Sequence, residues 1–130
     1  MTLSLTFKEA IDGWNNTFIT GDPSHLSNIV TDDFICRPTE GNETLAQVLE
    51  WATNCSSVLG DYKIIHEDEH SLCGFHSVIS PEKPVKRTKM VYMSLRDGKM
   101  AVHQCHEIVP DQVESFVIIS HAPAKPQRHR

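Results

Sequence analysis

Apolar side chains near the start of the chain recur every three or four residues, which is the spacing of one face of an amphipathic helix. Thr6 and Glu9 fit a capping box at the start of this helix, because each side chain can accept a hydrogen bond from the other residue's backbone N–H. Gly21 takes the place of a C-terminal glycine, and Pro23 prevents the helix from continuing. The pattern therefore predicts a first helix whose apolar face consists of Phe7, Ala10, Ile11, Trp14, Phe18 and Ile19.

Two shorter helices and a short strand are expected next. Residues 24–30 and 43–55 repeat the helical spacing, and Leu26 is an inward-facing residue of the first of these two. Residues 33–38 have the composition of a short strand that ends at Pro38.

The pattern changes to alternation after Gly60, which is typical of β-strands. Asp97-Gly98 predicts a tight hairpin, because these residues accept the positive φ angles of a primed turn. Residues 114–120 fit either one more strand or a dimer contact. The other predicted strands cover residues 62–67, 72–80, 86–95 and 100–109.

Helices that come first and antiparallel strands that follow indicate the α+β class. We expect one domain over residues 1–120 and a disordered tail at residues 121–130.

Composition excludes several classes of function. The chain has 130 residues and a net charge of −5, so it lacks the clustered positive charge of a general nucleic-acid binder. No stretch has the ~20 apolar residues of a membrane span, and the start does not look like a secretion signal. The cysteines are scattered and form no C-x-x-C pair. We expect a reduced, cytoplasmic protein with no nucleic-acid or membrane partner.

Three stretches, in this order, resemble the nuclear transport factor 2-like superfamily and, within it, the SnoaL-like and ketosteroid-isomerase-like branch. The resemblance implies a cone-shaped fold in which a curved antiparallel sheet wraps around the N-terminal helices and encloses one pocket. It also implies a homodimer packed sheet to sheet. The stretches are Trp14 to Phe18 followed by Thr20-Gly-Asp22 and Leu26, then Val30–Pro38 with its Asp33-Phe34 pair, and finally Arg96–Met100 followed by His103.

The strand at residues 86–95 favours a dimer independently. Val91 and Met93 alternate with Met90 and Tyr92, so both faces of this strand are largely apolar. Helices can cover one face of the sheet, and a partner sheet is then the natural cover for the other. The alternative is that residues 116–119 fold back over this face.

The resemblance places the base of the ketosteroid isomerases on Arg37 and their two hydrogen-bond donors on Trp14 and near Thr88. A protonated guanidinium cannot act as a base, so the familiar isomerase mechanism is not expected. Arg37 suggests an anchor for an anionic group instead, because a guanidinium binds a carboxylate bidentately. The alternative is a surface ion pair of Arg37 with Glu40 or Glu107.

The last predicted strand carries the candidate catalytic residues. His103, Cys105 and Glu107 share one face by alternation, and the resemblance implies that this is the pocket face. The family often has Trp-Asp where this chain has Gln104 and Cys105, so Glu107 is expected to serve with His103 as a proton carrier. A neighbouring carboxylate raises the pKa of a histidine toward neutrality, which suits acid/base catalysis. The alternative is a structural His103 that satisfies a backbone group.

Tyr92 is expected to line the pocket with Trp14 and to donate a hydrogen bond there. Met90 and Cys105 complete the predicted ligand-binding set, and Met90 also fits a core position. His66 and His76 reach the pocket beside His103 only in some strand registers, and zinc needs three or four convergent ligands. No metal and no cofactor are therefore expected.

Two functions follow from these residues. The first is a SnoaL-like pocket protein for a small anionic or polar-apolar ligand, with scope for an isomerase, lyase or cyclase activity by acid/base catalysis. It requires His103 and Arg37 on the inner side of the sheet. The second is a non-catalytic dimeric binding or scaffold module of the nuclear transport factor 2-like type.

Overall fold

The computed structural model describes residues 4–38, 41–81 and 83–108. The predicted strand or dimer contact at residues 114–120 and the predicted tail at residues 121–130 lie outside these residues, so the domain boundary stays a prediction. The elements, in chain order, are α1 (Phe7–Thr20), α2 (Ser24–Ser27), β1 (Val30–Arg37), β2 (Glu43–Thr44), α3 (Leu45–Thr53), β3 (Val58–Glu67), β4 (Ser71–Ser80), β5 (Lys83–Arg96) and β6 (Lys99–Ile108).

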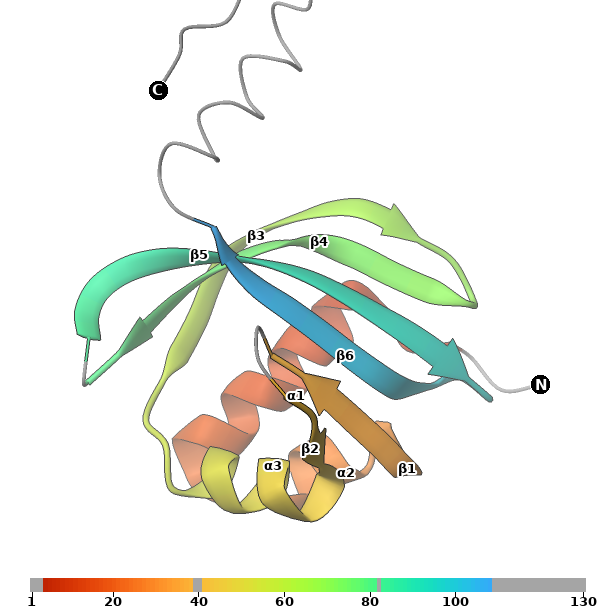
Figure 1. Cartoon of the computed structure of the whole chain (residues 1–130), viewed down its shortest axis with the longest axis horizontal. Helices are drawn as coiled ribbons and strands as arrows, with labels where there is room; N and C mark the ends of the chain where they lie inside the picture. Colours follow the sequence, from red (N-terminus) through yellow and green to blue (C-terminus); the bar gives the residue numbers. More distant parts are fainter. Residues whose placement is uncertain (1–3, 39–40, 82, 109–130) are drawn as a thin grey trace, which may run out of the picture.

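The strands form one curved sheet in the order β2-β1-β6-β5-β4-β3, and the helices lie on its concave side (Figure 1). This arrangement confirms the predicted α+β cone. The sheet is antiparallel except that β1 runs parallel to β6. The prediction of an entirely antiparallel sheet was therefore wrong for the pair β1 and β6. Strand β1 joins the sheet beside the last described strand, which is not next to it in the sequence.

Helix α1 begins and ends as predicted. The Thr6 hydroxyl accepts a hydrogen bond from the Glu9 backbone N–H at 3.1 Å, and the Glu9 carboxylate accepts one from Thr6 N–H at 2.9 Å. Gly21 closes the helix in the left-handed conformation with φ 74°. The carboxylate of Glu67 also accepts a hydrogen bond from Phe7 N–H at 2.7 Å. This contact fixes the start of α1 against the end of β3.

The two later helices are shorter than predicted. Helix α2 ends at Ser27, and Val30 already belongs to strand β1. Helix α3 begins at Leu45, because the Thr44 side chain caps it by accepting a hydrogen bond from Gln47 N–H. The hairpin between β5 and β6 is as predicted, with φ 56° at Asp97 and φ 78° at Gly98.

The core lies between α1 and the concave face of the sheet. Gly74 on β4 allows the closest approach, because a Cβ atom there would lie 2.4 Å from the Lys63 carbonyl oxygen and 2.9 Å from the ring of Phe7. The largest fully buried side chains are Phe7, Phe34, Leu26, Leu72, Met93, Met100, Val48, Val91 and Thr17.

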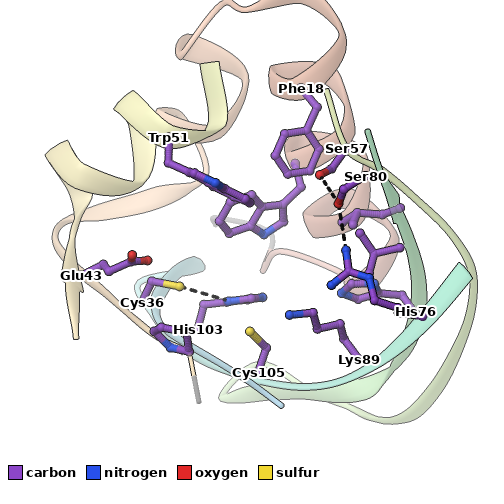
Figure 2. A pocket seen from close by; sticks show the side chains of 15 residues that line it. Phe18, Cys36, Glu43, Trp51, Ser57, His76, Ser80, Lys89, His103 and Cys105 are labelled. Atoms are coloured by element: carbon purple, nitrogen blue, oxygen red, sulfur yellow. Dashed lines mark hydrogen bonds between the residues drawn. The ribbon is translucent and has the colours of Figure 1, made fainter. Parts of the chain in front are cut away.

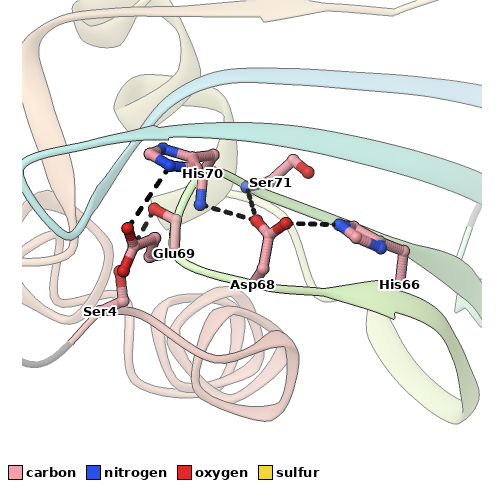
Figure 3. A network of polar contacts seen from close by, with 6 residues as sticks. All are labelled: Ser4, His66, Asp68, Glu69, His70 and Ser71. Atoms are coloured by element: carbon pink, nitrogen blue, oxygen red, sulfur yellow. Dashed lines mark hydrogen bonds and ion pairs between the residues drawn. The ribbon is translucent and has the colours of Figure 1, made fainter.

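The acidic turn between β3 and β4 is held by Asp68 (Figure 3). Its carboxylate accepts hydrogen bonds from the backbone N–H groups of His70 and Ser71 at 2.7 and 2.9 Å, and it lies 2.9 Å from Nε2 of His66. His66 therefore belongs to an exposed polar network at this turn. In the described part of the chain, no helix has the length and apolar character needed to cross a bilayer.

Candidate functional site

A cavity of about 280 Å³ lies between the concave face of the sheet and helices α1 and α3. Figure 2 shows it from close by. Its walls are mostly apolar, with a small number of polar groups, which is the usual composition of a small-molecule site. The lining residues are Trp14, Phe18, Cys36, Pro38, Glu43, Trp51, Ser57, Leu59, His76, Val78, Ser80, Arg87, Lys89, His103 and Cys105.

The helices supply an aromatic wall. The rings of Phe18 and Trp51 meet edge to face at 5.5 Å between centroids, and Trp14 lies 6.0 Å from Phe18 and 6.5 Å from Trp51. Trp51 is 53% exposed, so the cavity opens beside it. Such a wall favours a flat apolar ligand, because aromatic faces and edges pack well against other rings.

The sheet supplies a nitrogen-rich floor from three adjacent strands, with His76 on β4, Lys89 on β5 and His103 on β6. His103 is buried, and its ring centroid lies 5.1 Å from that of Trp14. Burial, with smaller effects of His76 and Lys89, lowers the pKa of His103 to about 3. Burial also lowers the pKa of His76. Both imidazoles are therefore neutral at physiological pH.

Cys36 contacts one of the two ring nitrogens of His103. Burial raises the pKa of the Cys36 thiol to about 12, so the thiol stays protonated. Its Sγ lies 3.7 Å from Nδ1 of His103, and either group can be the donor in this contact. When the S–H group donates, the neutral imidazole carries its hydrogen on Nε2. Figure 2 shows this second nitrogen pointing into the cavity.

Two further donors at this site have no partner in the described residues. The ammonium group of Lys89, a half-buried residue, makes no ion pair or hydrogen bond there, and Figure 2 shows it directed into the cavity. Nε1 of Trp14 is buried and has no hydrogen-bond partner among those residues. In the tautomer with its hydrogen on Nε2, His103 adds a third N–H donor for an oxygen of a ligand.

A second polar group is formed by Ser80 on β4, Arg87 on β5 and Glu107 on β6, together with Ser57 just before β3. Nη1 of Arg87 donates to the Glu107 carboxylate at 3.1 Å, and Nη2 donates to Ser80 Oγ at 2.8 Å. Ser80 and Ser57 are joined through their hydroxyl oxygens at 2.9 Å. Ser57 Oγ lies 3.0 Å from Cys55 Sγ.

Three of the predicted site residues line the cavity: Trp14, His103 and Cys105. Their chemical roles stay predictions. The remaining predicted ligand-binding residues do not line this cavity, and their roles also stay predictions. They are Arg37, Thr88, Met90 and Tyr92.

These differences have one physical cause. Alternation defines two faces of a strand but does not say which face is inside. On β5 the inner face carries Arg87 and Lys89, and Tyr92 is 43% exposed on the outer face. On β1 the inner residue is Cys36, and Arg37 is exposed.

Glu107 does not form the predicted pair with His103. It lies on the same strand, but its carboxylate pairs with Arg87, and it does not line the cavity. Since His103 has a lowered pKa and no carboxylate partner in the described residues, the expected upward shift of its pKa is also wrong.

Sequence reasoning missed Glu43, Arg87 and Lys89 as lining residues. The basic stretch at residues 83–89 was a usable signal, because two cations two residues apart on one strand share a face. His76 reaches the cavity and His66 does not. No group of three or more metal-ligating side chains in the described residues is arranged to hold a metal ion.

No family model matches this sequence, and no curated protein is similar to it in sequence. Solved structures are similar in fold. A nuclear transport factor 2-like protein of unknown function from Cytophaga hutchinsonii has 9% identity and a TM-score of 0.65, over 83% of this chain and 95% of that one. The chain has the nuclear transport factor 2-like fold.

Of two other structures similar in fold, one is described as an enzyme and the other as having the fold of an enzyme family. An epoxide hydrolase from M. tuberculosis has 13% identity and a TM-score of 0.58, over 90% of this chain and 98% of that one. A protein with a ketosteroid isomerase-like fold from Catenulispora acidiphila has 12% identity and a TM-score of 0.58, over 82% and 90%. At such low sequence identity, these proteins and this chain share the fold, and the function must be argued from the site.

Proposed function

We propose that this protein binds a small, largely apolar molecule that carries one acidic group. The aromatic wall of Trp14, Phe18 and Trp51 holds the apolar body, and Lys89 with the N–H groups of His103 and Trp14 holds the acidic oxygens. The volume of about 280 Å³ limits the ligand to a small molecule, since pockets for drug-sized ligands usually measure about 300–1,000 Å³.

The observation that carries this proposal is the pair of donors without a partner in the described residues, Lys89 Nζ and Trp14 Nε1. Nε1 of Trp14 is buried, and a buried donor without an acceptor costs about 1–3 kcal/mol. An acidic oxygen that accepts a hydrogen bond from Nε1 removes that cost, and a charge-assisted hydrogen bond from half-buried Lys89 adds to the gain.

The distribution of charge favours an anion on the floor of the cavity. Among the described lining residues, Glu43 is the other charged group without an ion pair, but it is exposed and lies across the cavity from Lys89 (Figure 2). Water therefore screens the carboxylate of Glu43 more than the half-buried ammonium of Lys89. Arg87 is already neutralised by Glu107.

A direct test compares 2-naphthoate with its neutral analogue 2-naphthamide, by calorimetry and by quenching of the two tryptophans. We expect 2-naphthoate to bind about tenfold more tightly, and Lys89→Met to abolish this preference. Lys86→Met is the matched control, because Lys86 is exposed on the same strand and pairs with Asp61. Equal affinity for the two probes, or a preference that survives Lys89→Met, contradicts the proposal.

A second candidate function is acid/base catalysis in the same cavity, with Glu43 in place of the predicted pair. It is favoured by one observation: a carboxylate lines the cavity opposite the N–H donors. In this scheme Glu43 takes a proton from a carbon acid, and Lys89 and His103 hold the oxygen that becomes negative.

The ring opening of 5-nitrobenzisoxazole tests this candidate, since a base removes the C–H proton, the N–O bond breaks, and a coloured phenolate forms. We expect a rate above that of free acetate, and a loss of at least tenfold in Glu43→Gln. Glu50→Gln is the control, because Glu50 is exposed on α3 and does not line the cavity. Equal rates for wild type and Glu43→Gln exclude Glu43 as the base.

A further inference from the structure

We propose that the cavity contains a second recognition point, formed by Arg87 with Ser80 and Ser57, that selects ligands with a neutral hydroxyl or carbonyl oxygen at the end opposite their acidic group. The inference rests on the proposed function and narrows it from simple apolar acids to hydroxy- or oxo-substituted ring acids.

Arg87 is held in one orientation by two contacts. Its side chain is 18% exposed, with Nη1 bound to Glu107 and Nη2 bound to Ser80. Nε is buried and has no hydrogen-bond partner in the described residues. A guanidinium presents its five N–H groups in a fixed fork, so fixing two nitrogens also fixes the third. The remaining N–H group is therefore a preoriented donor in a residue that lines the cavity.

Two hydroxyl groups, those of Ser80 and Ser57, lie beside Arg87. Arg87 can only donate, so Ser80 Oγ is the acceptor in their contact. Ser80 Oγ lies 2.9 Å from Ser57 Oγ, and Ser57 Oγ lies 3.0 Å from Cys55 Sγ, with either atom able to donate in each contact. Both hydroxyl groups therefore have partners within this chain. What the second recognition point lacks, among the described residues, is an acceptor for Nε–H of Arg87.

The charge at this point determines the kind of acceptor. Glu107 pairs with Arg87, so the guanidinium carries no uncompensated charge toward the ligand. The unpaired cation among the described lining residues is Lys89, two residues along the same strand. An acidic group therefore goes to Lys89, and a neutral oxygen suffices for Arg87.

The two points are spaced for one ligand. Arg87 and Lys89 lie on the same face of β5, and residues two apart on a strand are separated by about 6.6 Å. Figure 2 shows Ser57 and Ser80 on the opposite side of the cavity from Cys36 and Glu43. A two-ring acid with an oxygen on its far ring can contact both points and still lie against the aromatic wall.

Three isosteric probes test the inference: 2-naphthoate, 6-hydroxy-2-naphthoate and 6-amino-2-naphthoate, with dissociation constants from calorimetry on the full chain. The hydroxyl oxygen accepts a hydrogen bond from Arg87, and an aryl amine mainly donates. We expect 6-hydroxy-2-naphthoate to bind about tenfold more tightly than 2-naphthoate. We expect 6-amino-2-naphthoate to bind with the same affinity as 2-naphthoate.

Arg87→Met should remove the advantage of the hydroxy acid, so that its dissociation constant comes within about twofold of that of 2-naphthoate in the same variant. Arg87→Lys is the second variant, because it keeps a cation beside Glu107 but has no N–H at the position of Nε. Lys89→Met is the control, and it should weaken all three acids and preserve the ratio between them. Thermal melts of each variant establish that it is folded.

The outcomes separate the two proposals. If 2-naphthoate binds but the hydroxy acid binds no better, the second recognition point is wrong and the proposed function stands. If the advantage survives in both Arg87 variants, the hydroxyl is held elsewhere and the inference is overturned. If none of the three acids binds the wild-type protein, the proposed function fails, and the inference fails with it.

Discussion

The indole ring of Trp14 and the imidazole ring of His103 lie 5.1 Å apart between centroids, at an interplanar angle of 49°. One ring comes from the first helix and the other from the last described strand, so this contact joins the two layers of the cone. Both residues also line the cavity.

Trp14→Phe separates the packing of this ring from its donor. We expect the affinity for 2-naphthoate to fall about fivefold, because Nε1–H is lost. We expect the free energy of unfolding without ligand to change by only about 1 kcal/mol, since removal of an unpartnered donor offsets part of the lost packing. Urea unfolding and calorimetry measure the two effects. Trp51→Phe is the control for aromatic contact, and an unchanged affinity in Trp14→Phe would argue against the donor role.

The protonation of His103 links stability to pH. Its pKa is about 3 in the folded protein and 6.5 for an unperturbed histidine, so the unfolded chain binds more protons between these values. Stability is therefore fully present above pH 6.5 and is lost as the pH falls toward 3, by about 1.4 kcal/mol per pH unit. Burial of His76 acts in the same direction.

His103→Gln should therefore reduce the loss of stability between pH 7 and pH 5 by about 2 kcal/mol, measured by urea unfolding at both pH values. His106→Gln is the matched control, because His106 is exposed on the same strand and makes no ion pair in the described residues, so this variant should leave the loss unchanged. The same pH dependence in wild type and His103→Gln would show that His103 is not held neutral.

Gly74 is required where α1 packs on β4. Gly74→Ala places a methyl group 2.4 Å from the Lys63 carbonyl oxygen, so the strands or the helix must shift. We expect a loss of roughly 1–3 kcal/mol in the free energy of unfolding. Gly60→Ala is the control on β3, because its nearest neighbour would lie at 3.4 Å, and it should cost less than about 1 kcal/mol. Equal costs for the two variants contradict this account.

The outer face of the sheet is the proposed dimer surface. Tyr92 and Ile79 lie on this face and are 43% and 44% exposed. We expect a homodimer by light scattering, and a monomer for Tyr92→Arg, because a charge would be buried between the two sheets. Ile19→Arg is the control, since Ile19 is exposed on α1, away from the sheet. A wild-type protein that is monomeric at high micromolar concentration contradicts the dimer.

Features that depend on neighbours in the chain could be predicted from the sequence. The capping box of Thr6 and Glu9 and the glycine at the end of α1 involve contacts within one helical turn. The Asp97-Gly98 hairpin is equally local, because its positive φ angles depend on the two turn residues themselves. The segregation of helices and strands then restricted the fold to the α+β class.

The site depended on contacts that no local pattern contains. Cys36 and His103 are 67 residues apart in the chain, and Arg87 and Glu107 are 20 apart. The first contact gives Nδ1 of His103 its partner, and the second takes Glu107 out of the predicted catalytic pair. Their side chains meet because of the order and register of β1, β6 and β5.

The amino-acid sequence by itself determined the elements, the caps, the hairpin and the α+β architecture. These features depend on hydrogen bonds and on hydrophobic periods between residues that are close together in the chain. The helical spacing also identified Trp14 as inward-facing, and the resemblance to the superfamily implied the same for His103. Only the tertiary structure decided that the inner face of β5 carries Arg87 and Lys89 and not Tyr92. The physical reason is that alternation divides a strand into two faces, and the choice between them is made by the helices and strands packed against it.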